Sequence, residues 1–200
     1  MSKALLVVDV QNDFYPGGAL AVPAADKINS KINSLMEKDD YKKVVGTQDW
    51  HPQNHKSFAS SHDKEPFSEY QAKGIGPVLW PEHCVQQSKG AQFHNKINTE
   101  KFDLIIRKGY NPKIDSYSAF QENDGTNLGL SAYLKGLNIN EVDIVGLALD
   151  VCVKYTAEDA VNNGFKTKII LEGSKGIEQD QKKLGQILNE MREKGINIKE

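Results

Sequence analysis

The apolar residues of the chain gather in short runs, and most of these runs have the length and composition of buried β-strands. Residues 4–8 form a continuously apolar run, which is typical of a strand covered on both faces of a parallel sheet. Residues 142–149 begin in the same way, with several β-branched residues. The pattern predicts four further strands, at residues 43–47, 103–107, 166–171 and 195–198.

Between these runs the hydrophobic period changes to that of amphipathic helices. Residues 24–37 place Ile28, Ile32, Leu35 and Met36 on one side of a helix. The pattern predicts similar helices at residues 127–137, 152–163 and 178–194, and a short one at residues 91–98. Because strands alternate with helices, we expect an α/β fold with a mainly parallel sheet of about six strands and helices on both faces.

One long segment, residues 53–90, shows no sustained period and carries prolines, glycines, histidines and aromatic residues. A structureless segment of this length inside a domain is usually functional. We therefore expect a single domain over residues 1–200, with a long loop at about residues 50–90 that covers a site.

Composition narrows the functional classes. The formal net charge of −2 provides no electrostatic case for nucleic acid or an anionic membrane as partner. No apolar stretch is long enough to span a bilayer. The two cysteines form no disulfide framework, and no signal-peptide pattern is present, so we expect free thiols in a reducing compartment, the cytoplasm. The oligomeric state stays open, and a homo-oligomer is compatible with the sequence.

Polar residues stand directly after four of the predicted strands. They are Asp9, Asp49 with His51, Lys108, and Cys152. In parallel sheets, ligands bind beyond the carboxyl ends of the strands, and these ends share one edge. We therefore expect a nucleophile, a base, a cation and two metal-type ligands to meet there.

Cys152 is the candidate nucleophile. It follows a predicted helix cap at Asp150, and the first turn of a helix offers unpaired N–H groups and the positive end of the dipole. Both favour the reactive thiolate, although a free cysteine is often only a buried packing residue. Asp9 is the candidate base, and Lys108 could hold both groups by charge. Cys84 lies in a proline-bearing loop and is interpreted as a packing residue.

Asp49 and His51 stand two residues apart on a chain leaving a strand, where their side chains point the same way. This pair suits Zn, Mn or Fe(II), and a third ligand is required. The long loop offers His55, His62 and His83, each of which could equally be an ordinary surface residue. Three aromatic residues on the same rim could enclose a flat ring or simply seal the core: Phe14, Trp80 and Tyr117.

Taken together, these motifs resemble the nicotinamidases of the isochorismatase-like cysteine hydrolase superfamily. The resemblance rests on VVDVQNDF, TQDWHP, LWPEHCV, RKG, YSAF and VGLALDVCV, which occur in this order over nearly the whole chain. It implies a Rossmann-like three-layer α/β/α fold and hydrolysis of nicotinamide to nicotinate and ammonia in NAD salvage. It implies a catalytic triad of Asp9, Lys108 and Cys152.

The resemblance also implies the surroundings of the triad. Asp49, His51 and His83 match metal ligands, usually of zinc, and Phe14, Trp80 and Tyr117 match a substrate pocket. A cis peptide bond before Ala148 is implied, with the backbone N–H groups of Ala148 and Cys152 as the oxyanion hole. A fourth metal ligand stays open among Ser57, His55 and His62.

Two alternative functions stay open on the sequence. One is hydrolysis of a different small amide by the same superfamily. The other is a nucleotide-binding or scaffolding α/β domain without chemistry. Against the second, the first strand is followed by DVQNDF and not by the G-x-G-x-x-G phosphate turn.

Overall fold

The computed structural model describes residues 2–200, and within them six parallel strands form one sheet. The spatial order is β3-β2-β1-β4-β5-β6, so the first strand of the sequence lies near the centre. Every pair of neighbouring strands in this part of the chain is parallel. The strands are β1 Lys3–Val8, β2 Tyr41–Asp49, β3 Leu104–Lys108, β4 Glu141–Leu147, β5 Lys166–Lys175 and β6 Asn197–Lys199.

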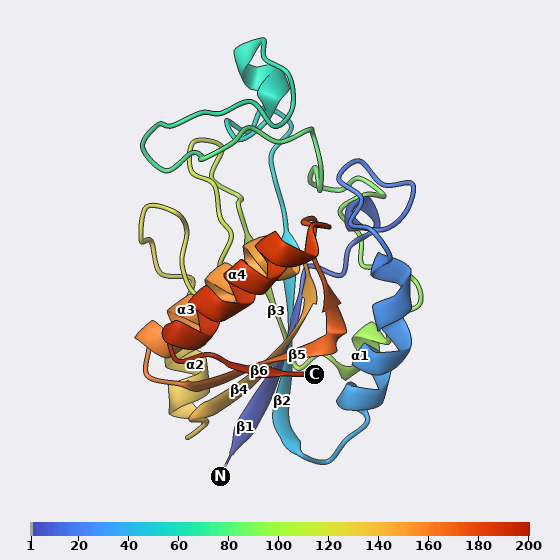
Figure 1. Cartoon of the computed structure of the whole chain (residues 1–200), viewed down its shortest axis with the longest axis vertical. Helices are drawn as coiled ribbons and strands as arrows, with labels where there is room; N and C mark the ends of the chain where they lie inside the picture. Colours follow the sequence, from blue (N-terminus) through green and yellow to red (C-terminus); the bar gives the residue numbers. More distant parts are fainter. Residues whose placement is uncertain (1) are drawn as a thin grey trace.

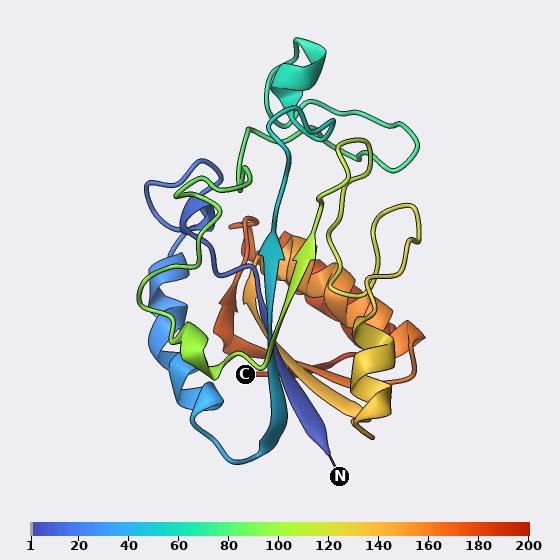
Figure 2. The same ribbon diagram turned by 180° about the vertical axis from the view of Figure 1, so that it is seen from behind.

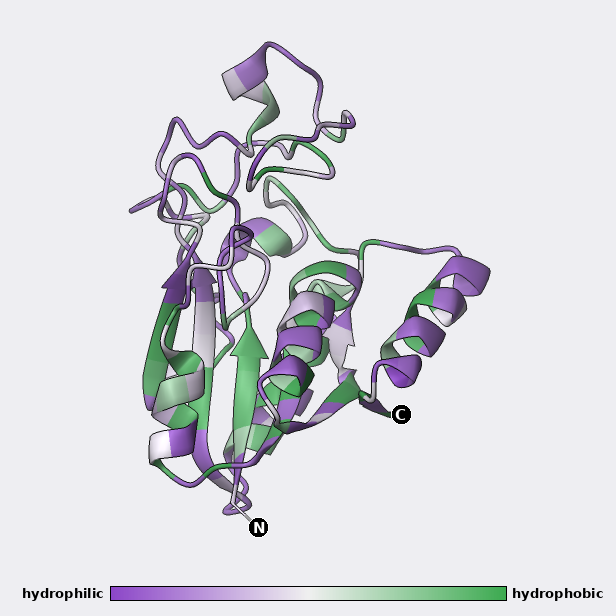
Figure 3. Cartoon of the chain, turned by 90° about the vertical axis from the view of Figure 1, so that its left-hand side faces the viewer, coloured by the Kyte–Doolittle hydropathy of each residue, from purple (hydrophilic) through white to green (hydrophobic). Residues whose placement is uncertain are grey.

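Helices cover both faces of the sheet, as the alternating pattern predicted. Helix α1 (Asn29–Met36) lies on one side, while α2 (Leu130–Gly136), α3 (Lys154–Asn162) and α4 (Gln181–Glu193) lie on the other (Figures 1 and 2). Figure 3 shows the hydrophobic residues concentrated in the strands and on the helix faces turned toward them. The arrangement is the predicted three-layer α/β/α fold.

Most predicted elements are confirmed, with shifted bounds. β2 and β5 are longer than predicted, and β2 runs on to include Asp49. The short helix predicted at residues 91–98 is wrong, because these residues form turns before a 3₁₀ turn at Thr99–Lys101. The segment between β2 and β3 contains no α-helix among the residues that the structure describes, and one further 3₁₀ turn spans Ala59–His62.

The arrowheads of β2 and β3 point toward the upper half of the molecule in Figure 2, where the long loops gather. The parallel register aligns neighbouring strand ends: Val7 pairs with Gly46 and Val145, and Asp49 pairs with Lys108. Side chains that follow β1, β2, β3 and β4 are thereby brought to one edge. Over residues 2–200, no helix has the length and apolar character needed to cross a bilayer.

Candidate active site

The sheet brings together the three side chains predicted to do chemistry. Asp9 follows β1, Lys108 ends β3, and Cys152 lies in a π-helical turn, Leu149–Val153, after β4. The Lys108 ammonium lies 2.9 Å from Asp9 Oδ2 and 3.6 Å from Cys152 Sγ. A carboxylate oxygen of Asp9 lies within 4.8 Å of the same sulfur. The side chains predicted as nucleophile, base and cation therefore lie within contact distance of one another.

Asp9 is held in place from the neighbouring strand. The Thr47 hydroxyl donates to Asp9 Oδ1 at 2.5 Å and accepts the Asp9 backbone N–H at 3.1 Å. The Asp9 backbone has φ +48°, a left-handed conformation that aspartate tolerates better than most residues. Burial raises the pKa of the Asp9 carboxyl, and Lys108 only partly offsets this effect. A carboxyl with a raised pKa is suited to exchanging protons near neutral pH.

Lys108 is fully buried and is nevertheless charged. Burial alone would lower the pKa of its ammonium, but Asp49 and Asp9 raise the pKa well above its ordinary value. The ammonium donates to Asp49 Oδ1 and, at 3.1 Å, to the Ser116 carbonyl. Buried charges are found where they are paired and hydrogen-bonded, and Lys108 meets both conditions. It gives the site one fixed positive charge between two carboxylates.

The surroundings of Cys152 differ from the prediction in two ways. Asp150 is not the helix cap; its carboxylate accepts the backbone N–H groups of Ile177 and Glu178 instead. Burial and the neighbouring carboxylates also raise the pKa of the Cys152 thiol well above its ordinary value, although Lys108 opposes them. The effect expected of the helix terminus, which favours the thiolate, is therefore outweighed by desolvation. The thiol needs a base before it can attack.

The predicted metal ligands face one another. Asp49 Oδ2 lies 3.7 Å from Nε2 of both His51 and His83. The Nδ1 atoms of the two rings contact backbone carbonyls, His51 with Gly109 at 2.9 Å and His83 with Pro81 at 2.8 Å. A carbonyl only accepts hydrogen bonds, so both Nδ1 atoms donate, and the Nε2 atoms, which remain as possible ligand atoms, both face Asp49. These donors fit a zinc-type ion, and the carbonyls orient the rings in the way that metal-ligating histidines require.

Gly109, which follows Lys108, allows His51 to reach this position. It has φ +66°, and a Cβ atom there would overlap the His51 ring. Glycine is therefore required here both for the close approach of His51 and for the left-handed backbone.

The three candidates for a fourth protein ligand, His55, His62 and Ser57, all make hydrogen bonds to other groups. His55 contacts the Ile114 carbonyl through Nε2 at 3.0 Å and Ser57 Oγ through Nδ1 at 2.7 Å, so both of its ring nitrogens are engaged. Burial lowers the pKa of His55 to about 4, which keeps the ring neutral. His62 contacts the Lys56 carbonyl at an exposed position of the loop. Ser57 Oγ is directed at His55.

The three predicted aromatic residues line one pocket with the nucleophile and the metal ligands. The Tyr117 hydroxyl donates to the Gly76 carbonyl at 3.0 Å and accepts the Trp80 indole N–H at 3.1 Å. Ala148 lines the same pocket, and the peptide bond before it is cis, as the resemblance implied. The lining consists of Phe14, Leu20, Asp49, His51, Trp80, His83, Asp115, Ser116, Tyr117, Ala148, Val151, Cys152 and Ile177.

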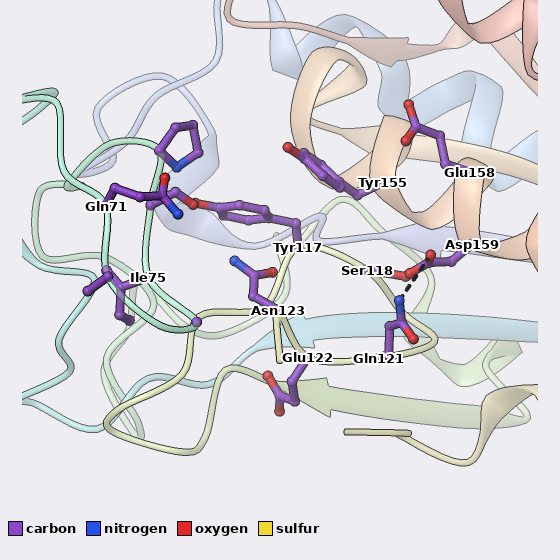
Figure 4. A pocket seen from close by; sticks show the side chains of 14 residues that line it. Gln71, Ile75, Tyr117, Ser118, Gln121, Glu122, Asn123, Tyr155, Glu158 and Asp159 are labelled. Carbon is purple, nitrogen blue, oxygen red and sulfur yellow. Dashed lines mark hydrogen bonds between the residues drawn. The ribbon is translucent and has the colours of Figure 1, made fainter. Parts of the chain in front are cut away.

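A second and larger cavity, of about 550 Å³, lies beyond Tyr117. Figure 4 shows Tyr117 and Tyr155 along this cavity, with Gln71 and Asn123 across from them. Tyr117 is a wall of both cavities, whereas neither the triad nor the predicted metal ligands line the larger one. The larger cavity is therefore not the one that contains the candidate active site.

The sequence analysis missed several polar residues of the site. Thr47 ends a predicted strand, so the same strand-end rule would have found it. Asp115 and Ser116 line the pocket from a loop without any pattern, and no sequence signal distinguishes them. Asp115 is 2% exposed, and its Oδ2 has no hydrogen-bond partner among the described residues.

Comparisons with known proteins agree with this geometry. The family model of the isochorismatase domain matches residues 3–196. The chain belongs to the isochorismatase family. Within this family it is grouped with nicotinamidases, which are amidohydrolases: it is 49% identical to the nicotinamidase of Acinetobacter baylyi over 88% of this chain and 83% of that protein.

Solved structures of this family show the same fold. The nicotinamidase/pyrazinamidase of Acinetobacter baumanii is 47% identical, with a TM-score of 0.93 over 100% of this chain and 96% of that one. The yeast nicotinamidase, bound to the inhibitor nicotinaldehyde, is 35% identical, with a TM-score of 0.91 over 99% of both chains. A pyrazinamidase of Pyrococcus horikoshii in complex with zinc is 38% identical, with a TM-score of 0.81 over 99% of this chain and 98% of that one.

Proposed function

We propose that this member of the isochorismatase family hydrolyses nicotinamide to nicotinate and ammonia through a thioester on Cys152. The observation that carries the proposal is the meeting of the Cys152 thiol, the Asp9 carboxyl and the Lys108 ammonium in one pocket. The names of its relatives, and the nicotinaldehyde bound to the yeast protein, support the pyridine carboxamide as substrate.

The reaction begins with a proton transfer. Asp9 takes the thiol proton of Cys152, because burial leaves the thiol protonated at rest. Lys108 stays positive throughout and compensates the negative charge that moves from the carboxylate to the sulfur. The thiolate then attacks the carboxamide carbon, and a C–S bond forms while the carbonyl oxygen becomes an anion.

Backbone donors stabilise that anion. We assign this role to the N–H groups of Ala148, which precedes the turn after β4, and of Cys152, which lies within it. The first N–H groups of a helix have no acceptor within the helix and point out from its end. Losing one such donor typically costs about 10²–10³ in rate.

The remaining steps return the enzyme to its starting state. The C–N bond breaks, and protonated Asp9 gives its proton to the leaving nitrogen, so ammonia departs. Water then attacks the thioester and loses a proton to Asp9. The C–S bond breaks, Asp9 returns its proton to the sulfur, and the acid product loses its carboxyl proton to solvent and leaves as nicotinate. One carboxyl thus moves protons in both halves of the reaction.

Asp49, His51 and His83 would hold one divalent metal ion, and we propose zinc, with Mn or Fe as alternatives. The zinc in the Pyrococcus horikoshii protein supports this identity. When bound, the ion supplies a Lewis-acid site that can hold a ring nitrogen. Phe14, Trp80 and Tyr117 flank the ring and fix its orientation, which brings the carboxamide to the sulfur.

The setting of this activity is also part of the proposal. We propose that the chain acts as one domain in the cytoplasm, in NAD salvage, with nicotinamide as its partner and without nucleic acid or membrane. Hydrolysis of another small amide by the same residues is the alternative.

The decisive experiment measures ammonia release from nicotinamide, pyrazinamide and a panel of aliphatic amides. We expect the highest kcat/KM with nicotinamide, and a nicotinoyl adduct on Cys152 by mass spectrometry after an acid quench. Preference for an aliphatic amide would favour the alternative substrate. Turnover at the parent rate by Cys152→Ala would refute the mechanism.

A further inference from the structure

The loop directly after Asp9 carries three consecutive polar residues that the proposed reaction does not use. Each of them is bonded to a segment distant in sequence: Gln11 to the end of β2, Asn12 to the Lys89 carbonyl at 2.8 Å, and Asp13 to the Cys84 N–H. In Figures 1 and 2 the loop, in blue, lies beside the green segment that precedes β3.

Gln11 fixes the backbone of the metal-facing Asp49. Its Oε1 accepts the Asp49 N–H at 2.8 Å, and its Nε2 donates to the Asp49 carbonyl at 2.8 Å. The same Nε2 also donates to the Ala91 carbonyl at 2.9 Å. The side-chain amide acts like one more peptide group of β1 and extends the sheet pairing to the residue that must point at the metal. Gln11 is fully buried, so these bonds are not shared with solvent.

Asp13 fixes the segment that carries His83. Its Oδ2 accepts the Cys84 N–H at 2.7 Å, which belongs to the peptide group joining His83 to Cys84. The Cys84 carbonyl in turn accepts the His51 N–H at 3.0 Å. One carboxylate therefore holds a residue bonded to both histidine segments. A charged acceptor makes this hydrogen bond stronger than a neutral one would.

Gly90 provides independent support that the position of the Asp13 carboxylate is built into the fold. A Cβ atom at Gly90 would overlap the carboxylate of Asp13. The Asp13 backbone N–H also donates to the Gly90 carbonyl at 3.0 Å. Gly90 does not have a positive φ, so alanine fits its backbone, and only the carboxylate stands in the way.

We propose that Gln11 and Asp13 are the positioning residues of the metal site: the loop after β1 sets the spacing of Asp49, His51 and His83. The proposal rests on the proposed metal site and extends it to residues that touch neither metal nor substrate. Residues behind metal ligands commonly contribute about 10- to 100-fold in metal affinity. The hydrogen bonds of the Asp13 carboxylate go to the His83–Cys84 peptide group and to Ala19, not to the triad, so we expect the triad to keep its geometry when Asp13 or Gly90 is altered.

The test measures the dissociation constant of Zn²⁺ by competition with a chromophoric chelator, on metal-free protein. The variants are Asp13→Ala, Gln11→Met and Gly90→Ala. Asn12→Ala is the matched control from the same loop. We expect the three variants to bind Zn²⁺ about 10- to 100-fold more weakly than the parent. Asn12→Ala should stay within about twofold, as is usual for a surface substitution.

A second measurement distinguishes a displaced metal site from a general loss of structure around the pocket. The alkylation rate of Cys152 by iodoacetamide, mapped by mass spectrometry to exclude Cys84, should be unchanged in Asp13→Ala, Gly90→Ala and Asn12→Ala. Gln11→Met is left out of this measurement, because Gln11 bonds to Asp49 and Asp49 contacts Lys108. Zn²⁺ affinity of Asp13→Ala and Gln11→Met equal to that of Asn12→Ala would overturn the inference. A matching change in Cys152 alkylation would also overturn it, because the whole site would then have loosened. If the parent binds Zn²⁺ no better than His83→Ala does, the proposed metal site is wrong, and this inference falls with it.

Discussion

The side chains proposed for catalysis and those proposed for metal binding reach the site from different kinds of structure. Asp9, Lys108 and Cys152, here called the catalytic half, stand at or just beyond the ends of β1, β3 and β4. In the metal half, Asp49 also ends a strand, but His51 and His83 belong to the long segment between β2 and β3. The first half is placed by the ends of paired strands, whereas the segments of His51 and His83 depend on hydrogen bonds to each other and to the loop after β1.

This difference has a physical consequence. A strand end inside a sheet moves only if the backbone hydrogen bonds of the sheet break, which is costly and cooperative. A loop can shift when one or two hydrogen bonds are lost, because loops draw on the low-stability part of a protein. We therefore expect substitutions in the metal half to change metal affinity while the reactivity of Cys152 stays the same. Substitutions in the catalytic half should change the reactivity of Cys152 while metal affinity stays the same.

The largest effect is expected for Cys152→Ala, which removes the nucleophile and leaves the metal half intact. Ammonia release from nicotinamide should fall by at least about 10⁴-fold, as is typical when a nucleophile is deleted. Zn²⁺ affinity should stay at the parent value, measured by chelator competition. A large loss of Zn²⁺ affinity in this variant would show that the two halves are not separate.

Asp49 tests the boundary between the halves, because one oxygen contacts Lys108 and the other faces both histidines. Asp49→Asn should weaken Zn²⁺ binding by more than about 100-fold, since even residues behind the ligands contribute up to that amount. It should also change the rate of Cys152 alkylation, because Lys108 loses a charged partner. His83→Ala should weaken Zn²⁺ binding alone. Identical alkylation rates in the two variants would contradict the shared role of Asp49.

The metal half should also respond to acid through His55, whose ring lies tilted against that of His51 with ring centroids 4.4 Å apart. The pKa of His55 is lowered from 6.5 to about 4 by burial, so the unfolded chain takes up this proton first as the pH falls. The free energy of unfolding should therefore fall between pH 6.5 and about 4, by up to about 3 kcal/mol from this residue.

Urea unfolding of the parent and of His55→Gln across this range measures the effect. The difference in free energy of unfolding between the two proteins should narrow as the pH falls, because only the parent carries the titrating ring. Other groups, including Asp9, are common to both proteins and cancel in the comparison. A difference that stays constant with pH would show that His55 does not titrate in this way.

The smallest effect is expected at Tyr117, which borders both cavities. Tyr117→Phe keeps the ring and removes the hydroxyl, which contacts the Gly76 carbonyl and the Trp80 indole. We expect KM for nicotinamide to rise by about fivefold, equivalent to about 1 kcal/mol for a lost hydrogen bond, with little change in kcat. Steady-state kinetics measure this split. A fall in kcat at constant KM would instead place the hydroxyl in the chemical step.

The order of the elements and the strand-end positions of the site could be predicted from the amino-acid sequence alone. Apolar runs such as residues 4–8 and 142–149 can be read locally, because a buried strand needs a continuous apolar stretch. The strand-end rule then assigned Asp9, Lys108 and Cys152 to one edge without any contact information. Recognisable motifs supplied His83, which no local pattern distinguished from His55 or His62.

The properties that depend on contacts between distant segments became visible only in the three-dimensional structure. It showed that Cys152 is desolvated beside carboxylates, so its thiol pKa rises where the helix terminus alone predicted a fall. It also showed that the ring nitrogens of His55 are engaged and that Gln11 and Asp13 hold the metal-facing segments. Burial, charge pairing and hydrogen-bond partners depend on distances in space, and a linear pattern of apolar and polar residues does not contain those distances.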